Sequence, residues 1–366
     1  MRLGIDTRLT YYRTGGISTY MRRLVSILEQ LDHDHDYTVF HSRKSRETLT
    51  TRFRRADLWT PCHHRLERLA LSLELLPQRL DLFHSPDFIP PLRGARRHII
   101  TVHDLTFLHY PQFLTAEARR YYNDQIDYAV RHADHILVDS EATQRDLVSM
   151  LSVPPEKITV HMLGVDKRFC LIDDAAERLA GLGLPPEYLL FVGTFEPRKN
   201  IVGLLRAYSK VRGRLPSVPP LLLVGRRGWL FDETLAQIES ERLNTNVIWH
   251  EDISDNDLPV VYNGASVLVL PSFYEGFGFP ALEAMACGCV PIVSNRSSLP
   301  EVVGSVGLQI NPDDTDDLAQ ALEKALVDAE WRGQQRAAGL ERAKAFTWEN
   351  TAEVVLSVYH KVGATL

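Results

Sequence analysis

Short apolar segments alternate with longer amphipathic segments along both halves of the 366-residue chain. This alternation is typical of parallel sheets whose strands are joined by crossover helices. In the first half it predicts strands at 3–7, 37–41, 82–85, 98–103, 135–139 and 158–162, and helices at 17–31, 116–132 and 141–151. In the second half it predicts strands at 188–192, 221–224, 247–250, 267–270, 291–294 and 308–310. The pattern therefore indicates an α/β protein with two Rossmann-like sheets.

The length of the chain also favours two domains, because 366 residues exceed what a single hydrophobic core usually supports. We expect an N-terminal domain over 1–164, with the hinge at Gly164-Val-Asp166, and a C-terminal domain over 165–345. The segment Thr347–Tyr359 carries an apolar stripe at helical spacing, so it predicts a helix that needs a surface to pack on.

Several function classes are disfavoured by what the sequence lacks. The chain opens directly into a strand rather than a signal peptide, and no apolar run approaches the length of a membrane span. The four cysteines (Cys62, Cys170, Cys287, Cys289) have no framework or metal-site spacing, so we expect reduced thiols in a cytoplasmic protein. No G-x-G-x-x-G follows the first strand of either half, which disfavours an NAD-dependent dehydrogenase.

Two glutamates, Glu275 and Glu283, bracket the junction between an apolar strand and the helix that starts near Pro280. Gly276 and Gly278 lie between them and allow main-chain N–H groups to approach a phosphate, and the helix N-terminus adds its positive dipole end. Carboxylates repel phosphate but bind hydroxyls. A nucleotide-sugar combines both chemistries, because its diphosphate lies between a ribose and a sugar.

With this E-x7-E pattern, the segment Gly193-Thr-Phe-Glu-Pro-Arg-Lys-Asn200 and the Gly15-Gly16 pair, the chain resembles the retaining glycosyltransferases of family 4. The resemblance spans almost the whole chain and is strongest between Tyr188 and Asn311. It implies the GT-B fold, in which two Rossmann-like domains face each other across a cleft. It also implies that the first domain meets the acceptor, that the second binds the donor, and that the last segment, 346–366, crosses back onto the N-terminal domain.

The resemblance assigns donor-binding roles to residues of the second half. Lys199 and Arg198 would neutralise the diphosphate and stabilise the leaving group. Glu275 would face the hydroxyls of the donor sugar, and Glu283 would accept hydrogen bonds from the ribose. The backbone of Gly276, Phe277 and Gly278 would contact the diphosphate or the sugar. Many relatives carry a further arginine where this chain has Thr194, so Arg198 would share that role.

In the first half, Gly15 and Gly16 occupy the position at which relatives close a glycine-rich loop over the donor phosphates. His103 ends a predicted strand, and relatives place a histidine there against the reacting sugar. Asp104 could hold the imidazole tautomer or act on the acceptor hydroxyl. The resemblance thus groups His103, Asp104, Glu275, Arg198 and Lys199 as catalytic residues.

The function that these motifs predict is retaining transfer of a hexose from a nucleotide-diphosphate sugar to a hydroxyl of a glycan or lipid-linked glycan. The motifs look like those of bacterial mannosyltransferases that build cell-surface polysaccharide, which favours GDP-mannose and leaves UDP-linked sugars open. A catalytically silent nucleotide-sugar-binding assembly subunit is the alternative. We expect no metal, because adjacent aspartates such as Asp313-Asp314 read as helix-start charges, and no nucleic acid partner.

Residues 43–97 are markedly basic, with 12 Lys or Arg against 6 Asp or Glu. One interpretation is a solvated face beside a core-facing helix in the segment Arg65–Leu76. The other is a surface that rests on an anionic membrane, which would make the protein peripheral on the cytoplasmic face.

Overall fold

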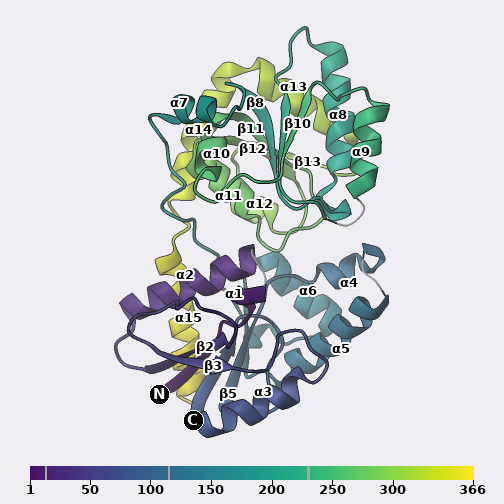
Figure 1. The fold of residues 1–366 in the computed structure, drawn as a ribbon. Coiled ribbons are helices and arrows are strands. Elements are labelled where there is room, and N and C mark those ends of the chain that lie inside the picture. The colour runs from purple at the N-terminus through teal and green to yellow at the C-terminus, as the bar shows by residue number, and fades with distance from the viewer. Residues whose placement is uncertain (13–14, 114–115, 229–230) are drawn as a thin grey trace. The chain divides into compact units, whose positions relative to one another are not determined.

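The structure is a computed structural model, and it describes residues 1–12, 15–113, 116–228 and 231–366. These residues form two compact units (Figure 1). The first comprises Met1–Gly164 together with Thr347–Leu366, and the second comprises Val165–Phe346.

The first unit contains a seven-stranded sheet in the order β3-β2-β1-β4-β5-β6-β7, and all the strand pairs are parallel. The strands are β1 (Arg2–Asp6), β2 (Asp36–Ser42), β3 (Arg54–Leu58), β4 (Leu80–Ser85), β5 (Ala95–Val102), β6 (His135–Val138) and β7 (Ile158–Val160). Its helices are α1 (Leu9–Tyr12), α2 (Gly16–Leu31), α3 (Glu67–Leu75), α4 (Thr106–His109), α5 (Ala116–His132), α6 (Glu141–Leu151) and α15 (Trp348–Gly363), with short 3-10 turns η1 (Leu76–Gln78), η2 (Pro111–Phe113) and η3 (Pro155–Lys157).

The second unit contains a six-stranded parallel sheet in the order β10-β9-β8-β11-β12-β13. Its strands are β8 (Tyr188–Val192), β9 (Leu221–Val224), β10 (Val247–His250), β11 (Ala265–Leu270), β12 (Val290–Ser294) and β13 (Leu308–Ile310). The helices are α7 (Ala175–Gly181), η4 (Pro197–Lys199), α8 (Ile201–Arg214), α9 (Phe231–Ser240), α10 (Leu258–Gly264), α11 (Phe279–Ala286), α12 (Leu299–Val303), α13 (Thr315–Val327) and α14 (Ala329–Ala343). The predicted pair of parallel, Rossmann-like sheets is confirmed.

The basic stretch 43–97 contains the strand β3, which the sequence pattern did not predict. Arg54, Arg55 and Asp57 interrupt its apolar pattern, and only Leu58 is buried. β3 lies at the edge of the sheet, where a strand has a single neighbour and much of its surface faces solvent. Such a strand needs few apolar residues, so periodicity could not reveal it.

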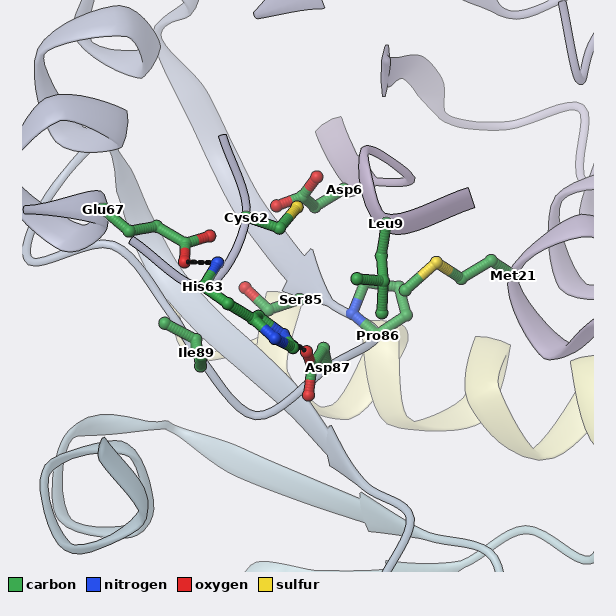
Figure 2. Close-up of a pocket in the computed structure, with 10 residues that line it drawn as sticks. All are labelled: Asp6, Leu9, Met21, Cys62, His63, Glu67, Ser85, Pro86, Asp87 and Ile89. Atoms are coloured by element: carbon green, nitrogen blue, oxygen red, sulfur yellow. Dashed lines mark hydrogen bonds and ion pairs between the residues drawn. The ribbon is translucent and has the colours of Figure 1, made fainter. Parts of the chain in front are cut away.

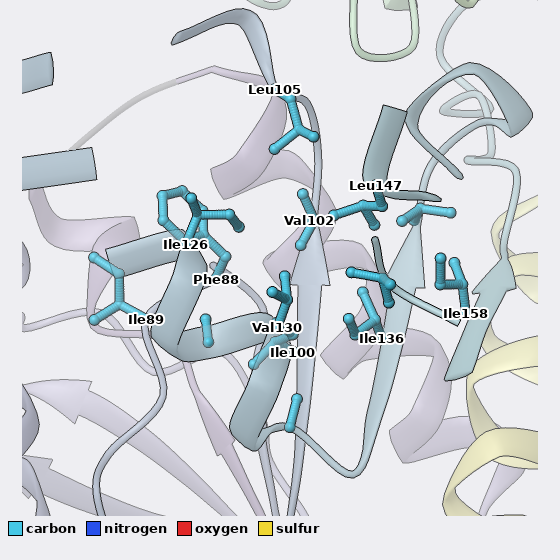
Figure 3. Close-up of a cluster of buried hydrophobic side chains, with 14 of the residues drawn as sticks. Phe88, Ile89, Ile100, Val102, Leu105, Ile126, Val130, Ile136, Leu147 and Ile158 are labelled. Carbon is cyan, nitrogen blue, oxygen red and sulfur yellow. The ribbon is translucent and has the colours of Figure 1, made fainter. Parts of the chain in front are cut away.

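The core of the first unit that lies nearest the candidate site is built from the central strands and the helices that cover them. Figure 3 shows Ile100 and Val102 of β5 beside Ile136 of β6, with Ile126 of α5 and Leu147 of α6 packed over them. All five side chains are at most 1% exposed. This packing fixes the carboxyl ends of β5 and β6, from which His103 and Asp139 follow directly.

The terminal helix α15 packs within the first unit. The Thr351 hydroxyl donates to the Met162 carbonyl over 2.7 Å, and the Tyr359 hydroxyl lies 2.7 Å from Nδ1 of His84. Gly164 lies against the chain that leads into α15, where an added Cβ would come within 2.2 Å of the Trp348 backbone nitrogen. Only glycine allows this close approach of the two chain segments.

Candidate functional site

The cationic part of the candidate donor site follows strand β8. Gly193 comes directly after the strand, and the turn η4 then places Arg198 and Lys199 side by side in the chain. Gly225 directly follows the neighbouring strand β9, and an added Cβ there would lie only 1.9 Å from the Gly193 carbonyl oxygen. In open parallel sheets ligands bind at the carboxyl ends of strands, which is where these residues lie.

Glu275 reaches this turn from the loop after β11 and pairs with both cations. Lys199 Nζ donates to Glu275 Oε1 over 2.6 Å, and Arg198 Nη1 donates to Glu275 Oε2 over 3.0 Å. The side chains of Lys199 and Glu275 are each 8% exposed, so this is a buried ion pair. Glu275 lies 76 positions from Lys199 and 77 positions from Arg198 in the sequence, and the three side chains form one cluster in the structure.

Further hydrogen bonds hold Glu275 in place. The Ser272 hydroxyl donates to Oε1 of Glu275 over 2.7 Å, and the Glu275 backbone N–H donates to the Ser297 hydroxyl over 2.9 Å. Glu196 pairs with Arg198 at 2.9 Å between Oε2 and Nε. The cluster therefore consists of two carboxylates and two cations that are joined by ion pairs and hydrogen bonds.

The charges of the cluster shift the pKa values of its members. Burial opposes ionisation of Glu275, but Lys199 and Arg198 outweigh that effect and lower its pKa to about 2. Burial and the neighbouring Arg198 lower the pKa of Lys199, although Glu275 opposes them. Glu275 is therefore ionised at neutral pH. Its negative charge pairs with Lys199 and Arg198, the two cations that the sequence analysis expects to bind a diphosphate.

The glycine segment between the two glutamates leads into helix α11. Gly278 precedes the helix with a φ of 106°, a backbone conformation that favours glycine. The Phe277 ring is buried and packs against Phe279 and Phe346 at centroid distances of 5.4 and 6.2 Å. The Phe277 ring is thus engaged in packing within the second unit.

Glu283 lies on α11 and has partners different from those of Glu275. Its Oε2 accepts a hydrogen bond of 2.8 Å from the Tyr262 hydroxyl. Burial raises the pKa of Glu283 to about 7, although Tyr262 and the more distant Arg168 oppose the shift. The two carboxylates of the E-x7-E pattern therefore differ in charge at neutral pH. Glu275 is fully ionised, whereas Glu283 is near the midpoint of its titration.

In the first unit, His103 follows β5 with both ring nitrogens engaged. Nδ1 lies 2.7 Å from Oδ2 of Asp139, and Nε2 lies 2.8 Å from the Pro86 carbonyl oxygen. Burial disfavours the charged imidazole, but the charge and hydrogen bond of Asp139 outweigh it and raise the pKa of His103 to about 9. Both partners are acceptors, so His103 is a cation that donates from both nitrogens.

The carboxylate that orients His103 is Asp139 rather than Asp104. Val102 and Val138 are register partners in the adjacent parallel strands β5 and β6, so the residues that follow them lie side by side. Asp104 instead accepts a 2.8 Å hydrogen bond from the Thr106 backbone at the start of α4. The pairing of the two predicted strands could have identified Asp139. The strand that ends at Asp139 lies beside the strand that ends at His103.

The glycine pair lies at the start of helix α2. Gly15 adopts a φ of 126° before the helix, and Gly16 is its first residue. An added Cβ at Gly15 would meet no atom of the described residues within 4 Å, so the backbone conformation is what favours glycine there. Residues 13 and 14, which precede the pair in the sequence, lie outside the described part of the chain.

A small polar pocket lies at the carboxyl ends of β1 and β4 (Figure 2). Its lining includes Asp6, Glu67, Asp87 and Ser85, and its volume is about 20 Å³, which is room for about one water molecule. The dashed lines in Figure 2 mark hydrogen bonds that His63 makes to Glu67 and Asp87. Burial raises the pKa of Glu67 to about 7. The pocket as it stands cannot hold a sugar.

No group of three or more His, Cys, Asp or Glu side chains in residues 1–12, 15–113, 116–228 and 231–366 is placed to hold a metal ion. Within the same residues, no helix is both long and apolar enough to cross a membrane.

Comparison with known proteins identifies the family. Residues 14–169 match the model of Glycosyltransferase Family 4, and residues 177–342 match that of Glycosyl transferases group 1. The O-antigen chain mannosyltransferase B of Escherichia coli is 31% identical over 98% of this chain and 99% of its own length. The serotype-specific mannosyltransferase WbdA of Escherichia coli is 33% identical over 63% of this chain, but that match spans only 29% of WbdA.

Solved structures show the same fold at lower identity. Sucrose-phosphate synthase from Thermosynechococcus elongatus has a TM-score of 0.82 at 23% identity, with complete coverage of both chains. Anabaena HepE in complex with UDP-glucose has a TM-score of 0.78 at 16% identity. The match covers 98% of this chain and 100% of the HepE chain. Taken with the full-length relative and the two family models, these matches show that the chain belongs to glycosyltransferase family 4, a family of retaining hexosyltransferases with the GT-B fold.

Proposed function

We propose that this glycosyltransferase transfers mannose, with retention, from GDP-mannose to a hydroxyl group of a glycan or lipid-linked glycan in polysaccharide biosynthesis. The observation that carries the choice of sugar is the 31% identity to an O-antigen chain mannosyltransferase over nearly the full length of both chains. The match to WbdA, which is also named as a mannosyltransferase, supports the same choice.

The cluster of Arg198, Lys199 and Glu275 supports the role of the second unit in binding the donor. A buried cation that is already fixed by a carboxylate loses little conformational entropy when a ligand binds. We infer that Glu275 holds Lys199 and Arg198 in the orientation that the diphosphate requires. The N-terminus of α11, which follows Gly276 and Gly278, would contribute its positive dipole end.

Glu283 is the proposed partner of the ribose hydroxyls. Its Tyr262 hydrogen bond fixes one carboxyl oxygen, and the other oxygen remains for a ligand hydroxyl. Because the pKa of Glu283 is raised to about 7, ribose hydroxyls that favour the ionised form would lower it on binding. Donor binding should therefore release a fraction of a proton near neutral pH.

His103 and the glycines at 15 and 16 are the proposed contribution of the first unit. With both nitrogens donating to Pro86 and Asp139, His103 is poorly placed to accept a proton, so we infer that it acts through its positive charge and its position. In the front-face reaction attributed to this family, the departing diphosphate assists the attack, and positioning and electrostatics carry the rate. Asp104 remains the proposed group for the acceptor hydroxyl.

Turnover of a panel of sugar donors tests the proposal. Purified protein is incubated with GDP-mannose, UDP-glucose, UDP-galactose or UDP-N-acetylglucosamine, with and without a mannose-terminated acceptor, and the released nucleotide is measured. We expect release from GDP-mannose above all others, and NMR of the product should show the α-anomer. Turnover confined to a UDP-sugar would overturn the choice of donor. Tight nucleotide-sugar binding without turnover would identify a silent assembly subunit.

A further inference from the structure

Five polar side chains form a chain of hydrogen bonds through the interior of the first unit. It begins in α15 and passes through β4, β5 and α2 to the residue that follows β7, in the order Tyr359, His84, Thr101, Tyr20 and His161. The successive distances are 2.7, 2.8, 3.3 and 2.9 Å. All five residues are 0% exposed, and none of them takes part in the proposed function.

The carbonyl group of Val138 fixes the direction of every bond in this chain. A carbonyl oxygen only accepts, so His161 donates to it from Nδ1 over 2.8 Å. Burial lowers the pKa of both His161 and His84, so each ring is neutral and carries one N–H. Nε2 of His161 therefore accepts from the Tyr20 hydroxyl. Because each hydroxyl has a single proton to donate, it follows that His84 donates from Nε2 and accepts at Nδ1.

The chain ends beside the carboxylate that pairs with His103. Nε2 of His161 lies 3.8 Å from Oδ1 of Asp139, whereas Oδ2 of Asp139 lies 2.7 Å from Nδ1 of His103. The Asp139 side chain is 4% exposed, and its Oδ1 has no hydrogen-bond partner among the described residues. A buried carboxylate oxygen normally has a donor. His161 supplies none, because its Nε2 carries no proton in the tautomer that the Val138 carbonyl selects.

The Tyr20 ring lies against both His103 and His161. Its centroid is 5.2 Å from the centroid of each imidazole, in edge-to-face geometry. Burial raises the pKa of Tyr20, so its hydroxyl keeps the proton that it donates to His161. A second proton on His161 would instead place a positive charge and a donor beside Asp139. Two cations would then share one carboxylate, and their repulsion would lower the pKa of His103.

We propose that Tyr20 and His161 are positioning residues for His103, because the Tyr20 hydroxyl holds His161 neutral and so leaves Asp139 to His103 alone. The hydrogen bonds that continue to Tyr359 anchor this arrangement in the terminal helix α15. The proposal rests on the proposed function only where it concerns turnover, since the contacts themselves do not involve the donor or the acceptor.

Several elements around His103 contribute the ionisable groups that act on it: Asp139 after β6, Asp87 after β4, His84 in β4, His161 after β7 and Tyr20 in α2. Asp87 is already paired with His63 at 2.7 Å. Nδ1 and Nε2 of His84 are both engaged within the chain of hydrogen bonds. Among these groups, His161 is therefore the one that would compete with His103 for Asp139.

The ring titrations of His103 and His161 test the proposal in the full-length protein. The NMR signals of isotope-labelled histidine rings are assigned with His103→Gln and His161→Asn, and the nitrogen shifts distinguish the tautomers and the charged ring. In the parent, His161 should be neutral with its proton on Nδ1, and His103 should stay charged up to about pH 9. In Tyr20→Phe, His103 should lose its proton at lower pH and His161 should gain one at higher pH than in the parent. Unchanged titrations in Tyr20→Phe that is folded by circular dichroism would overturn the proposal.

A matched control and a rescue variant make the test specific. Tyr208 is also 0% exposed, and its hydroxyl donates over 2.9 Å to the Pro219 carbonyl in the second unit, so Tyr208→Phe should leave both titrations unchanged. Equal effects of Tyr208→Phe and Tyr20→Phe would indicate general loosening and refute the proposal. Tyr20→Phe/His161→Asn should return the His103 titration toward that of the parent, since asparagine donates to a carbonyl but takes no charge. A titration that stayed at lower pH would show that His161 is not the competitor.

Turnover separates this proposal from the proposed function. Tyr20→Phe should lower kcat with GDP-mannose by roughly tenfold or more and change the donor KM by less than about twofold, because a small displacement of a site residue acts on the rate. A moved His103 titration with unchanged kcat would support the hydrogen-bond chain and remove His103 from the proposed mechanism. Turnover confined to a UDP-sugar would overturn the choice of donor alone, because the titrations use no donor.

Discussion

Replacing Glu275 with glutamine removes the carboxylate that holds Lys199 and Arg198. Its pKa is lowered from the ordinary value of 4.5 to about 2, which corresponds to about 3 kcal/mol of preference for the ionised form in the folded protein. Little of this is lost to solvent screening, because the side chain is 8% exposed. The variant also leaves Lys199 buried without its partner, and breaking such a pair typically costs about 3–5 kcal/mol.

We therefore expect Glu275→Gln to lower the free energy of unfolding of the second unit by about 3 kcal/mol at pH 7. For a domain of this size that loss lowers the melting temperature by roughly 6–12 °C. The effect should depend on pH in a defined direction. Because the pKa of Glu275 is lower in the folded state, its ionised carboxylate stabilises the fold above the unfolded pKa of 4.5. This stabilisation is lost as the pH falls toward about 2, so the difference in unfolding free energy between parent and variant should narrow over that range.

Thermal and urea unfolding at a series of pH values provides the measurement. The control Glu341→Gln removes a carboxylate that is 75% exposed and pairs with Lys344. It should change the free energy of unfolding by less than about 0.5 kcal/mol. In the double variant Lys199→Met/Glu275→Gln the loss should be smaller than the sum of the single losses. If Glu275→Gln were as stable as the parent at pH 7, the ion pair would contribute nothing and the reasoning would be refuted.

Four other substitutions test separate parts of the site and the fold. Lys199→Ala should weaken GDP binding by roughly tenfold or more, since losing a charge-assisted contact typically costs about 1.5–3 kcal/mol; unchanged affinity by calorimetry would remove Lys199 from the donor site. His103→Ala should lower turnover far more than nucleotide affinity, and turnover within about twofold of the parent would make His103 structural. The His103 cation should lose its proton as the pH rises through about 9, and Asp139→Asn should move that titration, followed by NMR of the ring, to lower pH. Gly164→Ala should lower the melting temperature, because its Cβ would lie 2.2 Å from the Trp348 backbone nitrogen, and an unchanged melting temperature would show that the two segments can separate.

Much of the fold could be predicted because its signals are local. The helices at 116–132 and 141–151 and the strands at 188–192, 221–224 and 247–250 have the predicted bounds, since the apolar period of each segment is set by the sheet or helix face that it buries. The strand β3 shows the limit of this reasoning. Its packing against one neighbour leaves it with almost no apolar pattern.

The candidate site was predictable in its residue types but not in its pairings. The E-x7-E spacing and the Arg198-Lys199 pair predict an anion-binding junction, yet the spacing does not say that Glu275 contacts Lys199 whereas Glu283 contacts Tyr262. Asp139 lies 36 residues from His103 in the chain and 2.7 Å from it in space. Only the parallel register of β5 and β6 makes these two residues neighbours.

The same distinction separates the composition of the basic segment from its surface. The sequence by itself determined that residues 43–97 are rich in arginine and that leucines recur in Arg65–Leu76. The tertiary structure decided which leucines face the core, and which carboxylates are already paired. The physical reason is that hydrophobic periodicity and backbone conformation act within a few residues, whereas burial, ion pairing and pKa depend on groups that come together only when distant segments pack.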